Sequence, residues 1–377
     1  MKFKDWGFYI GILVLSALFL FAGNHIATRG TEARARRSTV YLTAVVTHVT
    51  GRFEGEHSTE IAFDARVTRG GRRGELLAAH QRISHFNVAT EREVSAGDRV
   101  LIHYIEWDGF NEYHFFTYVR INSVMVLGAA FFVFVLLFGR KKGFNAIVGL
   151  GFTCISIFWV FIPAILAGRN VYATTIIICS FSIISTLLIV IGPNRKALSA
   201  IFGCLGGVAL AGFLMLVMDM VMQLTGVSQA MLALPADTII NMPALIFAGV
   251  ILGAVGAIMD VAMTISASLW ELKETVGRGQ EAVSTGILDF RSLFKSGLNI
   301  GTEILGTTLN SLILAYIGSS LSLILLISAQ AAPSAELFNT EMIIVEFLRA
   351  LVGSFGMLLT IPLTAVACGW LYSVNSE

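Results

Sequence analysis

Hydrophobic residues form long continuous runs over most of the chain, with few charges inside them. A membrane-spanning helix needs roughly 20 consecutive apolar residues, and eight runs approach or exceed that length. They lie at approximately residues 6–24, 123–139, 145–167, 171–191, 198–222, 244–268, 300–328 and 343–371. The pattern therefore predicts an α-helical integral membrane protein with about eight transmembrane helices.

The first run follows Lys2 and Lys4, which is also the arrangement of a secretory signal peptide. No clear small-residue cleavage pattern follows it, so residues 1–27 are expected to form an anchor helix. The composition agrees with a membrane protein, because 55% of the residues are hydrophobic and 14% are charged. A soluble domain has about 25% charged residues.

Between the first two runs, residues 39–121 alternate between apolar and polar positions with a period of two. Segments such as YLTAVVTHV, EIAFDARVTR and RVLIHYIEW are separated by GGRRG, AGD and DG, as in strands joined by turns. About 80 residues suffice for one compact β domain. We expect a small antiparallel β-barrel or sandwich within residues 28–121, followed by a polytopic membrane domain of about seven helices at residues 122–377.

The positive charges predict an orientation, because cytoplasmic loops of membrane proteins are enriched in Lys and Arg. With the N-terminus inside, the short outside loops carry only Arg169. The inside segments carry Lys2, Lys4, Arg140, Lys141, Lys142, Arg195, Lys196, Lys273, Arg278, Arg291 and Lys295. This distribution predicts cytoplasmic termini in the plasma membrane and an extracytoplasmic β domain. The sequence has no basic stripe with interleaved aromatic residues, so nucleic-acid binding is not expected.

All seven histidines lie between His25 and His114. A two-residue turn at Asp108 and Gly109 would place His103 opposite His114 across a hairpin. A metal-binding or pH-sensing pair is one interpretation, but two imidazoles are not a metal site, and we expect solvated histidines with no metal or cofactor. The four cysteines lie inside apolar runs, so we expect them to be small core residues. They are Cys154, Cys179, Cys204 and Cys368.

The sixth run contains an aspartate, Asp260, within GAIMDVAMTISASLWEL. Ionisable residues at membrane depth are costly and usually face protein or water, which makes Asp260 a candidate functional residue. Thr264 follows one helical turn later on the same face. We expect this face to contact a neighbouring helix.

The last two runs contain further ionisable residues. In GLNIGTEILGTTLNSLILAYIG, Glu303 and Asn310 share one helix face. We expect them to lie next to Asp260, where two nearby carboxylates would leave one protonated near neutral pH. In EFLRALVGSFG, Glu346 and Arg349 have the i, i+3 spacing of an ion pair.

Glycines accompany these polar residues at three- and four-residue steps, and such glycines let helices approach closely. The expected helix-packing positions are Gly249, Gly253, Gly256, Gly306, Gly353 and Gly356. Interhelical polar contacts contribute about 0.6–2 kcal/mol, so the acids could simply hold helices together. Ser, Thr or Asn would do so at a lower desolvation cost, which favours proton or ion coupling through Asp260, Thr264, Glu303 and Asn310.

Three segments resemble the YibE/F family of bacterial membrane proteins: GAIMDVAMTISASLWEL, SGLNIGTEILGTTLNSLILAYIGSSLSLILL and EFLRALVGSFGMLLTIPLTA. The likeness covers the membrane half from about residue 123, and the additional β domain is similar to that of a YibE-like member. The resemblance implies a shorter YibF-like paralogous partner in the membrane, with a homo-oligomer as the alternative.

A weaker resemblance concerns the glycine-rich helix with its aspartate, the following WELKETVGRGQEAVSTGILDFRSLFKSG and the next polar helix. This region is similar to the proton-relay region of resistance-nodulation-division permeases and of SecD/SecF proteins. In those proteins an aspartate in the middle of one helix faces polar groups on the next. The resemblance implies a proton relay at Asp260.

Two functions follow from these observations. The first is a secondary transporter, or a transporter subunit, for a small solute or ion, with protons or sodium coupled through the intramembrane acids. The alternative is a non-transporting scaffold or sensor whose β domain binds a ligand or partner protein. An enzyme is not expected, because the sequence has no HExxH, GxSG-type serine or GxGD-type aspartate signal.

Overall fold

The computed structural model describes residues 3–28, 41–84, 92–107, 110–226, 241–278, 289–329 and 333–373. The chain forms two compact units. One comprises Met1–Gly30 and Phe138–Glu377 and is helical. The other, Thr31–Leu137, contains a β-barrel and the beginning of a long helix.

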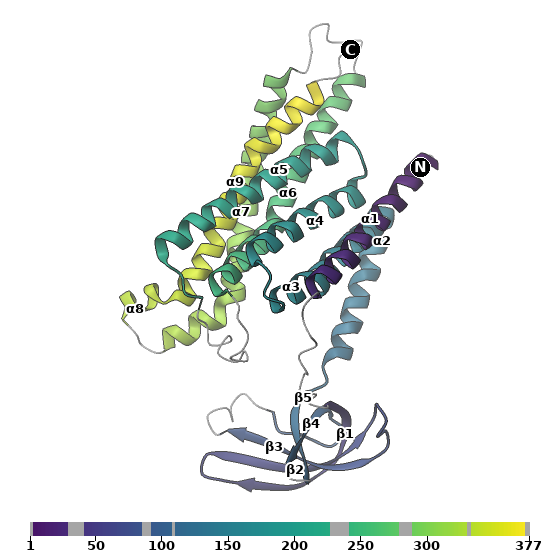
Figure 1. Cartoon of the computed structure of the whole chain (residues 1–377), viewed down its shortest axis with the longest axis vertical. Helices are drawn as coiled ribbons and strands as arrows, with labels where there is room; N and C mark the ends of the chain where they lie inside the picture. The colour runs from purple at the N-terminus through teal and green to yellow at the C-terminus, as the bar shows by residue number, and fades with distance from the viewer. Residues whose placement is uncertain are drawn as a thin grey trace. The chain divides into compact units, whose positions relative to one another are not determined.

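Five strands form the barrel: β1 (Tyr41–Glu54), β2 (Ser58–Val67), β3 (Leu76–Ser84), β4 (Arg99–Trp107) and β5 (Phe110–Tyr118). They close in the order β1-β2-β3-β5-β4, with β4 returning to β1 (Figure 1). The sequence predicts an antiparallel barrel or sandwich, whereas the structure is a closed barrel in which β3 and β5 pair in parallel. The chain crosses over between β3 and β4, which places β3 beside β5. The local alternation pattern contains no signal for this crossover.

The barrel interior follows the period-two alternation of the strands. Along β2, the side chains of Ile61, Phe63 and Ala65 are buried, while the positions between them are more exposed. Two irregularities in the β1–β2 register, between Val46 and His48 and beyond Val49, interrupt the long strand β1. Such bulges bend a strand and increase its twist, which helps a small sheet to close.

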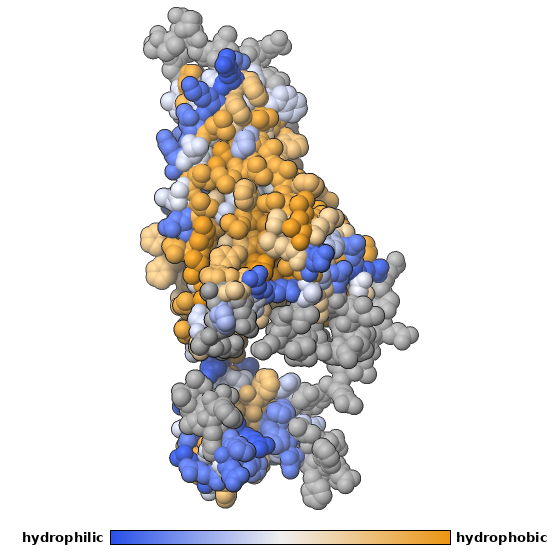
Figure 2. Space-filling model, turned by 90° about the vertical axis from the view of Figure 1, so that its left-hand side faces the viewer, coloured by the Kyte–Doolittle hydropathy of each residue, from blue (hydrophilic) through white to orange (hydrophobic). Residues whose placement is uncertain are grey.

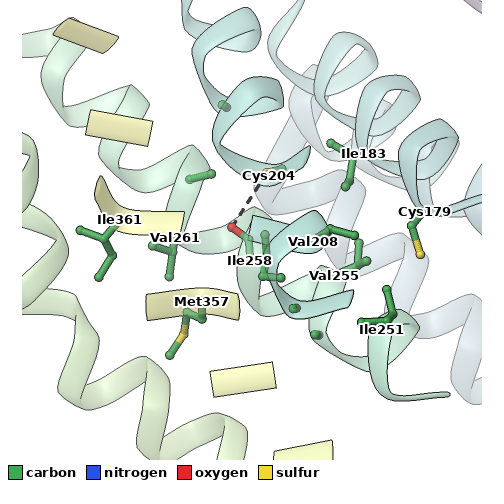
Figure 3. Close-up of a cluster of buried hydrophobic side chains, with 14 of the residues drawn as sticks. Cys179, Ile183, Cys204, Val208, Ile251, Val255, Ile258, Val261, Met357 and Ile361 are labelled. Atoms are coloured by element: carbon green, nitrogen blue, oxygen red, sulfur yellow. Dashed lines mark hydrogen bonds between the residues drawn. The ribbon is translucent and has the colours of Figure 1, made fainter. Parts of the chain in front are cut away.

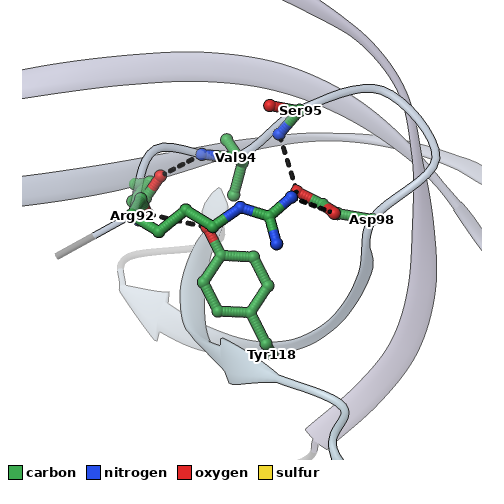
Figure 4. A network of polar contacts seen from close by, with 6 residues as sticks. Arg92, Val94, Ser95, Asp98 and Tyr118 are labelled. Atoms are coloured by element: carbon green, nitrogen blue, oxygen red, sulfur yellow. Dashed lines mark hydrogen bonds and ion pairs between the residues drawn. The ribbon is translucent and has the colours of Figure 1, made fainter.

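A polar network fixes the segment before β4 (Figure 4). The guanidinium of Arg92 donates to both carboxylate oxygens of Asp98, at 2.8 and 3.1 Å, and lies over the ring of Tyr118. Buried Gln81 accepts from the Val94 N–H and donates to the Arg92 carbonyl. These bonds satisfy backbone groups that the sheet ladder leaves unpaired.

The remaining elements are helical. They are α1 (Phe3–Thr28), α2 (Ile121–Ile155), the π-helix η1 (Ser156–Phe161), α3 (Ile162–Leu166), α4 (Val171–Ile191), α5 (Arg195–Met222), α6 (Met242–Arg278), α7 (Phe290–Ala329), α8 (Ser334–Asn339) and α9 (Glu341–Ser373). Asn170 and Asn194 cap α4 and α5, each accepting from the backbone N–H three residues later. The helical unit has a broad hydrophobic surface (Figure 2), as expected for contact with lipid.

Seven helical runs of the described chain are long and apolar enough to cross a membrane, whereas the sequence predicts eight. The difference arises because the runs predicted at 123–139 and 145–167 join in one stretch of 46 residues, Ile121–Leu166. Arg140 interrupts this stretch with non-helical angles, φ 49° and ψ −125°. At about 1.5 Å per residue the stretch measures roughly 69 Å, about twice the hydrocarbon thickness of a bilayer, so its length accommodates two spans.

Helix α9 packs against α5, α6 and α7 (Figure 1). Small residues permit these contacts. A Cβ atom on Gly203 or Gly207 of α5 would clash with Thr364 or Thr360 of α9, respectively, and one on Gly301 of α7 would clash with Ile361. Close backbone approach through small residues is the usual means of helix association in membranes.

The core of the helical unit is apolar and contains Cys179, Cys204 and Cys368, all buried and free. The thiol of Cys204 points to the Ile258 carbonyl on α6, at 3.9 Å (Figure 3). Cys154 differs from the sequence-based expectation, because it is exposed on the surface of the chain. It lies in α2, whose apolar side chains are also mostly exposed.

Candidate functional site

A cavity of about 540 Å³ lies in the helical unit, near the first turns of α9. Its walls are mostly apolar and come from η1, α3, α6, α7 and α9. Three ionisable side chains also line it, Glu341, Glu346 and Arg349, all from α9. A cavity of this size, apolar with a few converging polar groups, is typical of a small-molecule site.

Glu346 and Arg349 form the ion pair that their spacing predicts. The Arg349 Nη1 atom donates to both carboxylate oxygens of Glu346, at 2.9 and 3.1 Å. The side chain of Arg349 is 29% exposed and that of Glu346 is 22% exposed. The pair is therefore partly desolvated yet accessible from the cavity.

Two glycines next to this pair make room for polar side chains. A Cβ on Gly249 of α6 would lie 3.5 Å from Arg349 Nη2, and one on Gly253 would lie 3.0 Å from the Tyr316 hydroxyl. Gly353 of α9 is close to the same hydroxyl, at 3.4 Å from its Cβ position. The face of α6 that the sequence assigns to helix packing thus accommodates an arginine and a tyrosine.

Two polar atoms at this place lack partners among the described residues. The Tyr316 hydroxyl and Arg349 Nε are both buried without a hydrogen bond among the described residues. Buried polar groups are normally bonded, and each exception calls for an explanation. A molecule entering the cavity could accept hydrogen bonds from Arg349 while its apolar part contacts the walls.

The wall formed by η1 is irregular. Ile157 and Phe161, from this π-helix, face the cavity together with Ile162. Single π-turns inserted into α-helices are rare and frequently mark functional sites. Pro163 follows in the first turn of α3 and has no backbone N–H to donate to the preceding π-turn.

Glu341 closes the cavity on the side where α9 begins. Its carboxylate accepts from the Thr225 hydroxyl and from the Gly226 backbone N–H. A carboxylate in the first turn of a helix is also favoured by the helix dipole. These two bonds connect the segment after α5 to α9.

The predicted coupling residues lie elsewhere. Asp260, Thr264, Glu303 and Asn310 are all exposed on the surface of the chain. No hydrogen bond or ion pair of either carboxylate side chain occurs among the described residues, and the Thr264 hydroxyl donates to the Asp260 backbone carbonyl, at 2.7 Å. No bond between Asp260 and Glu303 or Asn310 occurs in the described chain, and α7 packs chiefly on α9 rather than on α6.

The other predicted packing glycines divide into two groups. Gly356 is tightly packed, because a Cβ there would lie 2.9 Å from Ala211 of α5 and 3.0 Å from Ile258 of α6. Nothing in the described chain lies within 4 Å of a Cβ at Gly256 or Gly306. These two glycines belong to the same exposed faces as Asp260 and Glu303.

In the barrel, His103 pairs with His114 in the β4–β5 register, as the spacing predicts. Their ring centroids are 5.7 Å apart, and His80 of β3 pairs with His114 on its other side. No group of three or more potential ligands with metal-binding geometry occurs in the described ranges. The proposed turn at residues 108–109 lies outside the described residues.

Sequence reasoning missed Tyr316 and Glu341. Tyr316 is a single aromatic residue in an apolar run, and no sequence pattern marks its hydroxyl as part of a polar site. Glu341 precedes the last run and could have been noticed as an N-terminal carboxylate. Its partners, however, are more than 100 residues away along the chain.

Several long apolar helices, together with a hydrophobic outer surface, define a multi-pass integral membrane protein. A family model described as YibE/F-like protein matches residues 127–374. The chain belongs to this family, which confirms the resemblance found in its sequence. No curated protein and no solved structure matches the chain.

Proposed function

We propose that the protein is a secondary transporter, or a subunit of one, for a small solute or ion. The main support for this proposal is the cavity of about 540 Å³, which is lined by the Glu346–Arg349 pair and by apolar walls. Only Nη1 of Arg349 bonds to Glu346, and Nε has no partner within the described chain. An arginine with spare donors favours a solute with an anionic or hydrogen-bond-accepting group.

We further propose that protons or sodium ions are coupled through Asp260 and Glu303. An aspartate at the centre of a membrane helix costs about 2.5–3.5 kcal/mol on insertion scales. Exposure of both acids on the isolated chain therefore requires a cover of protein or water in the membrane. A YibF-like partner, or a second copy of the chain, is the proposed cover.

Flux measurements test the transport proposal. The full-length chain is reconstituted in proteoliposomes with and without its partner, and a trapped pH-sensitive dye reports proton movement when small organic anions are added. Anion-dependent proton flux that is lost in Arg349→Gln supports the proposal. Absence of flux in both preparations, with the proteins correctly inserted, contradicts it.

The proposed orientation has cytoplasmic termini and an extracytoplasmic barrel. A cysteine at Ser58, in β2, should react with an impermeant thiol reagent on intact cells, and one at Ser284 should not. Each is introduced into a chain with its four native cysteines replaced. The reverse labelling would overturn the orientation.

A scaffold or sensor is the second candidate, because the barrel has a hydrophobic core of its own within a separate compact unit. This function requires no solute flux. It predicts that deletion of residues 41–118 abolishes partner binding, whereas Asp260→Asn leaves the protein active.

A further inference from the structure

A second cavity, of about 610 Å³, lies within the unit Thr31–Leu137, where the barrel meets the first turn of α2. Its walls include Thr43 of β1, Leu101 of β4 and Thr117 of β5. Ile121 and Val124 of α2 complete it. None of these residues belongs to the candidate transport site.

Three arginines line this cavity, Arg69, Arg99 and Arg120, and all are exposed. None of them forms an ion pair with a carboxylate among the described residues. Elsewhere on the barrel, the guanidinium of Arg92 binds Asp98 and that of Arg72 binds Glu75. The cavity therefore concentrates positive charge without a counterion from the described chain.

The cavity lies at the boundary of the apolar segment of α2. The Val119 N–H donates to the Arg99 carbonyl, at 2.9 Å, so the sheet pairing continues to within two residues of Ile121. Val124, Val126 and Leu127 follow at once and are 61–72% exposed. Because these side chains must enter the hydrocarbon region, the cavity lies at the depth of the lipid headgroups.

Tyr118 strengthens the assignment of this depth. Its ring lies under the guanidinium of Arg120, at 5.4 Å, and also lines the cavity. Tyrosine is enriched at the membrane–water interface, where its ring is partly apolar and its hydroxyl is hydrated. The cavity thus combines cationic, aromatic and aliphatic surfaces in one place.

We propose that this cavity binds the phosphate of an anionic phospholipid, with Arg69, Arg99 and Arg120 as donors. Guanidinium groups match phosphate oxygens in geometry and charge. Val124 and Ile121 contact the apolar part of the lipid below the phosphate. The bound lipid fixes the end of the barrel at the membrane surface, whatever the helical unit transports.

Native mass spectrometry of the full-length protein in detergent tests the proposal. Phosphatidylglycerol and phosphatidylcholine are added in equal amounts, and the bound lipids are counted. The wild-type protein should retain phosphatidylglycerol preferentially. Arg69→Gln/Arg99→Gln should lose this preference by about fivefold for each arginine, the effect expected of a basic residue near an anionic surface.

A charge-matched control is available at the other end of the barrel. In the β2–β3 register, Arg66 lies opposite Leu76 at the end of the sheet next to the cavity. Arg82 lies opposite Glu60, six residues further from that end along both strands. Arg52 lies seven residues beyond Val45 in β1, at most about 23 Å away along the strand. Arg52→Gln/Arg82→Gln should retain the preference, and an equal loss in both double variants would overturn the proposal.

Two further measurements keep the test decisive. If the variants do not fold, the preference of the wild-type protein for phosphatidylglycerol should still fall as salt is raised, and a salt-independent preference would contradict the site. Inorganic phosphate distinguishes a lipid site from a free-anion site. Retention of inorganic phosphate by lipid-free protein, with displacement of phosphatidylglycerol, would overturn the assignment to lipid.

Discussion

The hydroxyl oxygen of Tyr316 lies 3.0 Å from the position that a Cβ atom on Gly253 would occupy. This places a side chain of α7 directly against the backbone of α6, beside the cavity. A side chain at position 253 therefore requires the Tyr316 hydroxyl to shift by a few tenths of an ångström. The contact therefore connects the glycine face of α6 with the arrangement of the polar groups around Arg349.

Gly253→Ala should destabilise the purified protein by about 1 kcal/mol, the lower end of the usual cost of overpacking, because only the Tyr316 hydroxyl must shift. Gly256→Ala is the matched control, because nothing in the described chain lies within 4 Å of its Cβ position. There, alanine should be neutral or stabilise the helix by about 0.5–1 kcal/mol. Thermal unfolding in detergent measures both, and equal effects at the two positions would refute the packing account.

Removing either partner of the Glu346–Arg349 pair should be more damaging than removing both. A single substitution, Glu346→Gln or Arg349→Gln, leaves an uncompensated charge in a partly desolvated place, at a cost of up to about 3 kcal/mol. The double variant leaves none and should recover much of the loss. A double-mutant cycle on detergent stability gives the coupling energy, and additive effects would leave the pair without a role in stability.

Asp260→Asn should insert and assemble normally but abolish proton-dependent flux, because the amide keeps the size and loses the titration. Asp260→Leu should impair assembly with the partner as well. Asp219, an aspartate near the C-terminal end of α5, supplies the control, and Asp219→Asn should retain flux. A fully active, gradient-responsive Asp260→Asn protein would favour the scaffold function.

The barrel should become less stable in acid through His103. Burial, and then the charge of nearby His114, lower the pKa of His103 below its usual 6.5. The folded barrel binds the proton more weakly than the unfolded chain, so its stability is complete above pH 6.5 and is lost as the pH falls through the lowered pKa. Hydrogen exchange of β4 at pH 5 and pH 7 measures this loss.

His103→Gln should reduce this pH dependence, and His57→Gln, an exposed histidine between β1 and β2, should not. The same acid sensitivity in the wild-type protein and His103→Gln would assign the effect to other groups.

Local patterns predicted the parts of the molecule that depend on neighbouring residues in the chain. Alternation found the strands, and the i, i+3 spacing found the Glu346–Arg349 pair, because both are set by backbone geometry. The parallel pairing of β3 with β5 and the insertion of Tyr316 beside Gly253 depend on contacts between distant segments. Periodicity has no information about these, and for the same reason it could not decide which helix lies beside Asp260.

The position of α9 has a consequence for how the protein is made. α5, α6 and α7 are translated before α9, although each packs against it. Until α9 is made, the glycines of α5 and α7 that receive its side chains lack these contacts. A chain that ends before residue 341 would therefore leave α5, α6 and α7 without their common packing partner.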